Sequence, residues 1–122
     1  MDYKSYKILL EERRKWYKTI KKIYCPCLRA DVVFNSKGFY HIRYDSSGRE
    51  RPLHEQVIRL NLLPLVVPLI RQSKSIHEYR ISSNNTLELF AVQGEINGNR
   101  IRVVLKRKFG SNIIYFSVMK PR

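Results

Sequence analysis

Residues 86–119 read TLELFAVQGEINGNRIRVVLKRKFGSNIIYFSVM and contain the pattern that decides the fold class. Three runs rich in β-branched and aromatic residues follow one another there, at 86–96, 100–108 and 113–119. Asn97-Gly98 separates the first two runs and favours a tight hairpin turn, because both central positions of that turn need a positive φ. We therefore predict an antiparallel meander for the C-terminal half, extended by a short strand at 78–81.

Upstream of the meander the apolar residues recur at three and four positions, which is typical of amphipathic helices. From residue 3 to about 24 an apolar stripe lies opposite a row of Lys and Arg, and Pro26 is expected to end this helix. Two further helices are predicted between residues 53 and 71, with a restart at Pro64 and a bend at Pro68.

The segment between these helices is ambiguous. Residues 31–34 predict a short strand. Residues 38–44 alternate as a strand would, but Asn35-Ser36 offers a helix N-cap, and Phe39 and Ile42 are three positions apart. We prefer a short helix there, and a strand stays open as the alternative.

These elements predict an α+β fold, in which N-terminal helices pack on one face of a twisted antiparallel sheet of about four to five strands. A chain of 122 residues with 43% hydrophobic content can form one core. We expect residues 1–28 to form a basic amphipathic appendage and residues 29–122 to form the α+β domain.

The charge balance is the strongest functional signal. Twenty-four Lys and Arg against ten Asp and Glu give a net charge of +14. This much like charge destabilises the compact state by self-repulsion, and a polyanion is the usual partner that offsets it. The sequence therefore predicts binding to RNA or another nucleic acid, with a merely solubilising surface as the alternative.

Basic residues are concentrated in the final hairpin, where they alternate with aromatic ones. Such interleaving suits a phosphate backbone and stacked single-stranded bases. We expect the sheet face away from the helices to present these cations together with Tyr115 and Ser117. The alternative is a solvated hairpin whose charged edges discourage strand pairing. The residues assigned to nucleic-acid contact are Arg43, Arg49, Arg51, Arg102, Lys108 and Lys120.

Three histidines, His41, His54 and His77, are candidates for proton transfer because imidazole titrates near neutral pH. Metal-free RNA cleavage requires a proton-transfer group and a cation that stabilises the charge developing on the phosphate. His41-Ile42-Arg43 places an imidazole and a guanidinium close in sequence. A lone histidine is more often structural, so its position alone does not single out His41.

Other chemistries fit the sequence poorly. Cys25-Pro26-Cys27 lacks the second Cys or His pair that structural zinc needs, and the carboxylates are too sparse for a two-metal nuclease. We expect no metal and no cofactor. The polar N-terminus does not resemble a signal peptide, and the apolar stretch 60–70 is too short to span a bilayer. A cytoplasmic protein with reduced thiols and no membrane association is therefore expected.

Three short motifs, in this order along the chain, resemble those of the phage and mobile-element nucleases related to barnase, EndoU, certain colicins and RelE. The resemblance covers about residues 31–120, and its motifs are Val32–Ile42 with its His41-Ile42 pair, Val103–Arg107 and Tyr115–Val118.

The resemblance implies a ribonuclease-like or RelE-like sheet with a metal-independent RNA cleft. By position, His41 would be the catalytic proton-transfer group, and Lys106 or Arg107 would stabilise the phosphorane. Ser117 and Tyr115 would line the cleft.

Three hypotheses follow. The first is a toxin-like or phage-associated endoribonuclease that cleaves RNA by 2′-hydroxyl attack. The second is a non-catalytic RNA-binding or DNA-binding protein on the same scaffold. The third is an interaction module whose basic face meets an acidic protein, such as a cognate inhibitor or antitoxin.

Overall fold

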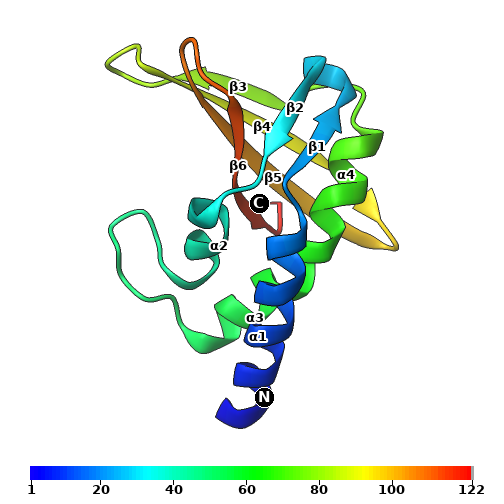
Figure 1. Ribbon diagram of the computed structural model, residues 1–122, viewed down its shortest axis with the longest axis vertical. Helices are drawn as coiled ribbons and strands as arrows, with labels where there is room; N and C mark the ends of the chain where they lie inside the picture. The colour runs from blue at the N-terminus through cyan, green and yellow to red at the C-terminus, as the bar shows by residue number, and fades with distance from the viewer. Residues whose placement is uncertain (122) are drawn as a thin grey trace.

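The structure is a computed structural model that describes residues 1–121 and combines helices with one six-stranded mixed sheet (Figure 1). Its elements are, in chain order, α1 (Tyr3–Thr19), β1 (Lys22–Cys25), the 3-10 turn η1 (Pro26–Leu28), β2 (Ala30–Val33), α2 (Ser36–Arg43), α3 (Leu53–Leu62), the 3-10 turn η2 (Leu63–Leu65), α4 (Val66–Gln72), β3 (Glu78–Ile81), β4 (Leu87–Ile96), β5 (Asn99–Lys108) and β6 (Ile113–Met119).

The sheet has the strand order β1-β2-β6-β5-β4-β3. All neighbouring strands are antiparallel except β2 and β6, which run parallel and pair only through Val32 with Ile113 and Val33 with Ile114. The prediction of an α+β fold is confirmed. The prediction of a purely antiparallel sheet of four to five strands is wrong, because β1 adds a strand and β2 inserts parallel to β6.

Strand β1 is the element that the sequence pattern missed. A helix was predicted as far as residue 24, but α1 ends at Thr19. Beyond it Ile23 and Cys25 are buried while Lys22 and Tyr24 are exposed, which is the alternation of a strand. Because Ile23 lies three positions after Ile20, its spacing also fits a helix, and a four-residue strand is too short to break that ambiguity.

The other elements lie close to their predicted places. The four strands of the meander and the helix restart after Pro64 are present, and residues 36–43 form a helix rather than a strand. The Asn35 side chain accepts a hydrogen bond of 3.1 Å from the Lys37 backbone N–H, so the predicted N-cap is formed.

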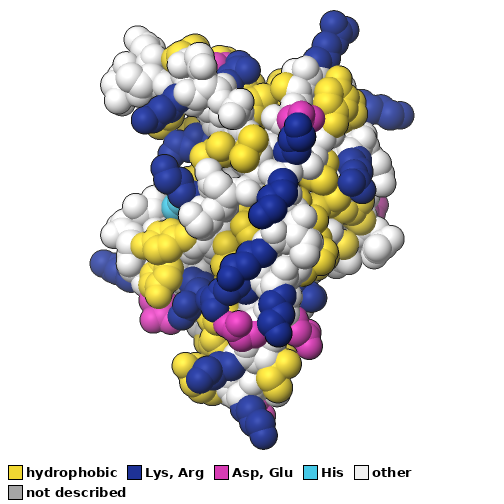
Figure 2. Space-filling view, in the orientation of Figure 1, with side chains coloured by type: hydrophobic (Ala, Val, Ile, Leu, Met, Phe, Trp, Pro, Cys, Tyr) yellow, Lys and Arg dark blue, Asp and Glu magenta, His cyan; other side chains and the backbone are white. Residues whose placement is uncertain are grey.

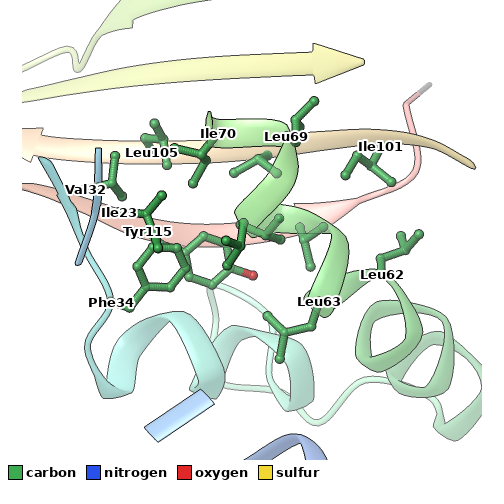
Figure 3. Close-up of a cluster of buried hydrophobic side chains, with 14 of the residues drawn as sticks. Ile23, Val32, Phe34, Leu62, Leu63, Leu69, Ile70, Ile101, Leu105 and Tyr115 are labelled. Carbon is green, nitrogen blue, oxygen red and sulfur yellow. The ribbon is translucent and has the colours of Figure 1, made fainter. Parts of the chain in front are cut away.

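The helices and the sheet enclose one hydrophobic core. Helix α4 contacts β1 and β4, α2 and α3 contact β6, and α1 packs against α3. Figure 3 shows Ile70 of α4 beside Leu105 of β5, with the Tyr115 and Phe34 rings below them. Tyr6, Leu10 and Tyr17 of α1 belong to the same core, so residues on both sides of position 28 share it.

The helical run Leu53–Gln72 is long and apolar enough to cross a membrane, judged by length and composition alone. In this fold the run is interrupted by η2, and its residues Leu60, Leu63, Val66 and Ile70 are fully buried. Packing in the protein core accounts for the same composition.

Gly38 lets α2 approach the sheet closely. A Cβ at this position would lie 2.8 Å from Tyr115 Cε2 and 2.5 Å from the Tyr17 hydroxyl oxygen. Neither ring has room to move, because Tyr115 is fully buried against Phe34 at 5.0 Å between centroids, and the Tyr17 hydroxyl donates a hydrogen bond to the Asn35 carbonyl. A glycine is therefore needed where α2 meets β6.

Gly38→Ala is expected to lower the free energy of unfolding by up to about 2 kcal/mol, toward the upper end because the added Cβ would lie less than 3 Å from two buried rings. Overpacking a filled core costs about 1–3 kcal/mol, which exceeds the gain of about 1 kcal/mol from replacing a helical glycine. Urea denaturation measures the change, with the exposed Ser36→Ala as the control on the same helix. A Gly38→Ala protein as stable as the wild type would contradict the close packing.

Candidate nucleic-acid interface

A cleft of about 550 Å³ opens between α2 and the β5–β6 hairpin. Figure 2 shows a hollow in this region, where a histidine is visible among Lys and Arg side chains. Among residues 1–121 no carboxylate lines the cleft. Its lining residues are Asn35, Lys37, Tyr40, His41, Leu87, Lys106, Lys108, Ser111, Asn112, Ile114 and Phe116.

Helix α2 contributes two of the charged or titratable groups. Lys37 and His41 are one helical turn apart and therefore point to the same side, toward the cleft. The C-terminal end of the helix is held by Arg51, whose Nε donates a hydrogen bond of 2.9 Å to the His41 carbonyl oxygen. The position of the imidazole thus depends on a capped start and a tethered end of the same short helix.

The opposite wall comes from β5 and β6. The Phe116 ring lies 4.0 Å from the imidazole of His41 between centroids, and the Lys106 ammonium lies 4.6 Å from the centre of the Phe116 ring. The sheet is irregular here: Val104 is opposite Ser117 while Leu105 is opposite Tyr115, so Phe116 is the extra residue of a β-bulge. Bulges commonly redirect a side chain, and this one lies where Phe116 meets His41.

The surroundings keep the imidazole neutral. Partial burial lowers the pKa of His41 below its usual value of 6.5, and the positive charges of Arg51, Lys106 and Arg59 lower it further, against a backbone hydrogen bond at Tyr44. A histidine with a lowered pKa is mostly unprotonated at neutral pH. Its free nitrogen can therefore accept a proton or a hydrogen bond.

A pair of arginines supports α2 and β6. The Glu55 carboxylate pairs with Arg51 Nη1 at 3.1 Å and with Arg59 Nη2 at 3.3 Å, and the side chains of both arginines are mostly buried. Arg59 Nη1 also donates a hydrogen bond of 3.0 Å to the Val118 carbonyl. Two guanidinium groups share one carboxylate, so the group of Arg51, Arg59 and Glu55 keeps a net positive charge close to His41.

The structure brings together some of the predicted catalytic residues and separates others. His41 and Lys106 line the same cleft. The expectation that Tyr115 and Ser117 lie on the exposed face with the cations is wrong: Tyr115 is 0% exposed inside the core, and Ser117 is 5% exposed. Arg107 lies on the other side of β5 and forms a two-pronged ion pair with Glu88, at 3.1 and 3.0 Å.

The residues predicted for nucleic-acid contact are also divided. Lys108 lines the cleft, and Arg51 lies behind His41. Arg43 lines a neighbouring groove between α1 and α2, and Arg49 is exposed in the loop after α2. The two others lie elsewhere: Arg102 is bound to Glu78 and Gln93, and Lys120 lies beside the β4–β5 turn.

Several site residues were missed by the sequence reasoning. Lys37 precedes His41 by four positions, so the preference for a helix at this segment could have placed both on one face. The alternation places Phe116 on the face opposite Tyr115, but that face was expected to pack on the helices. Tyr40 and Arg59 gave no sequence signal of their own, because their places depend on how α2 and α3 pack.

The two cysteines lie apart from the cleft. The Cys25 and Cys27 sulfurs are 3.6 Å apart, and Cys25 also contacts the Ser73 hydroxyl at 3.3 Å. Within the part of the chain that the structure describes, no group of three or more His, Cys, Asp or Glu side chains could hold a metal ion.

Comparisons with protein-family models, with curated proteins and with solved structures found no match to this chain. The resemblance to the barnase, EndoU, colicin and RelE group therefore stays a prediction.

The electrostatics of the cleft can be tested without an assay of function. His41 is expected to titrate below 6.5 in an NMR pH titration of the histidine ring protons, because burial and neighbouring cations disfavour its charged form. Lys106→Met removes one of these cations and should raise the pKa of His41. Lys120→Met, which removes the same charge far from the cleft, should leave it unchanged. Titration of wild-type His41 at or above 6.5 would contradict the environment described.

Proposed function

We propose that this chain is a metal-independent endoribonuclease that binds RNA in the cleft and uses His41 as the general base. One observation carries the proposal: a half-buried histidine with a lowered pKa lies in an open cleft with Lys37, Lys106 and Lys108 and no carboxylate among the described lining residues. Phosphodiester cleavage needs this combination of a neutral base and fixed positive charge.

The chemistry of the cleft favours RNA as the ligand. Lysines without a carboxylate beside them attract phosphates, and the net charge of +14 adds long-range attraction. Tyr40, which is 46% exposed, offers a ring face on which an unpaired base can stack. These features suit a single-stranded segment better than a duplex, whose bases are already stacked.

The proposed reaction begins when His41 accepts the proton of a ribose 2′-hydroxyl. The 2′-oxygen attacks the adjacent phosphorus, the bond from phosphorus to the 5′-oxygen breaks, and the products are a 2′,3′-cyclic phosphate and a free 5′-hydroxyl. Lys106 stabilises the charge that develops on the phosphate oxygens. The leaving 5′-oxygen takes a proton from a donor in the cleft, for which Tyr40 and Lys37 are the candidates.

A non-catalytic RNA-binding protein is the second candidate, and a specific observation favours it. Among residues 1–121 neither a second histidine nor a carboxylate lines the cleft, and no side chain forms a hydrogen bond with the His41 ring. Catalytic histidines are commonly oriented by such a partner. The same cleft would then retain RNA without cutting it.

We also propose a biological setting for the chain. The resemblance noted from the sequence suggests a toxin-like role in a phage or mobile element, acting on cytoplasmic RNA. A cognate inhibitor would then be an acidic protein, because it must compete with RNA for the basic surface.

The proposal predicts that the purified protein cleaves labelled single-stranded RNA in the presence of EDTA. His41→Ala should reduce the cleavage rate by about 10²–10⁴-fold, since that is the usual contribution of a general base. RNA affinity should change by only a few fold. Because the pKa of His41 is lowered, kcat/KM should rise with pH along a limb whose midpoint lies below 6.5 and then level off.

The exposed His54 at the start of α3 provides the matched control, and His54→Ala should cleave as the wild type does. A substrate with a single 2′-deoxynucleotide at the cut site should resist cleavage. Tight RNA binding without cleavage would reject the nuclease and support the second candidate. Failure to bind RNA at all would reject both.

A further inference from the structure

A second basic groove adjoins the proposed RNA cleft. It has a volume of about 430 Å³ and lies between α1 and α2. Asn35 and Tyr40 line both the groove and the cleft, so the two hollows meet at α2. The floor of the groove is apolar and aromatic, with Tyr17, Phe34 and Phe39, and its rim is cationic.

The rim cations are available to a ligand. Arg14, Lys18, Lys21 and Arg43 line the groove, and of these only Arg14 has an ion-pair partner, Glu11, among the described residues. Figure 2 shows Lys and Arg side chains in a row over α1 and the adjoining part of β1. The row provides a continuous positive surface beside the groove.

Arg43 supplies an independent observation. Its Nε is buried and has no hydrogen-bond partner within residues 1–121. Because this nitrogen is buried, Arg43 acts on a ligand in the groove through the positive charge of its guanidinium group. The same guanidinium lies 5.4 Å from the centre of the Tyr44 ring, which holds it at the groove wall.

Aromatic rings mark the junction of the two hollows. The Tyr40 and Tyr44 rings stack at 4.7 Å between centroids, and Tyr40 keeps 46% of its surface exposed. A stacked pair of this kind presents a rigid ring face to an unpaired base. Cations on both sides of the pair can bind the phosphates that flank such a base.

We infer that the groove is an extended subsite for single-stranded RNA, which takes the nucleotides that flank the segment held in the cleft. This inference rests on the proposed function. Tyr40 stacks a base at the junction, and Lys18, Lys21 and Arg43 bind the phosphates on the α1 side. A duplex is disfavoured, because its bases are not free to stack on Tyr40.

The test compares two labelled single-stranded RNAs by fluorescence anisotropy on the full chain, one short enough to fill the cleft alone and one long enough to reach α1. The 2′-hydroxyls of both are replaced by 2′-O-methyl groups to prevent cleavage. The wild type is expected to bind the longer RNA more tightly. Lys18→Gln with Lys21→Gln should remove most of that gain and leave the affinity for the short RNA nearly unchanged.

The salt dependence gives a second readout. Each phosphate contact on a single strand contributes about 0.7 to the slope of log affinity against log salt, so the double variant should lower the slope by about 1.4 for the longer RNA only. The matched control is Lys15→Gln with Lys74→Gln, which removes the same charge from exposed lysines outside both hollows. It should bind both RNAs with nearly wild-type affinity.

Two results overturn the inference separately from the proposed function. If the wild type binds both RNAs with equal affinity, or if both double variants lose affinity equally, the groove is not a subsite although the cleft still binds RNA. Tighter binding of a duplex of the longer length would also reject a single-stranded subsite. If the wild type binds neither RNA, the proposed function fails and the groove inference fails with it.

Discussion

The contact between Gly38 of α2 and the Tyr115 ring of β6 is the constraint on which the arrangement of the cleft depends. Strand β2 pairs with β6 through only two residues, which leaves the rest of that edge without a neighbouring strand. Helix α2 packs there instead, at a distance that only glycine permits. His41 lies one turn further along α2 and is therefore carried over the β-bulge, against Phe116.

The excess of positive charge divides into structural and available cations. Arg51 and Arg59 share Glu55, Arg102 binds Glu78, and Arg107 binds Glu88, so these guanidiniums mainly join elements of the fold. Lysines on α1, α2 and β5 line the cleft and the adjoining groove without carboxylate partners among the described residues. Within the described residues, Lys18, Lys21, Lys37, Arg43, Lys106 and Lys108 thus line two adjoining hollows without an ion-pair partner, which suits the extended RNA ligand that we propose.

The pKa of His41 connects the fold to the proposed chemistry. Burial beneath the β-bulge and the positive charges of Arg51, Lys106 and Arg59 act in the same direction, toward a neutral ring. A bound phosphate would offset part of this positive charge and so change the proton affinity of His41 when substrate is present. The pKa of His41 is thus low in the free protein and would rise when a phosphate binds. This suits a base that must take up a proton during the reaction.

The sequence alone determined the elements whose signals are local. Asn97-Gly98 and the alternating runs around it predicted the meander, and the Asn35 cap predicted α2, because turn and cap chemistry act within a few residues. The tertiary structure decided what depends on distant partners. Pairing with β2 makes the segment with Ile23 and Cys25 an edge strand. Packing of the helices places Tyr115 in the core, and Arg107 pairs with Glu88. The β-bulge brings Phe116 into contact with His41. The alternation of a strand defines two faces but not which of them the helices will cover, so the composition of the cleft required the fold.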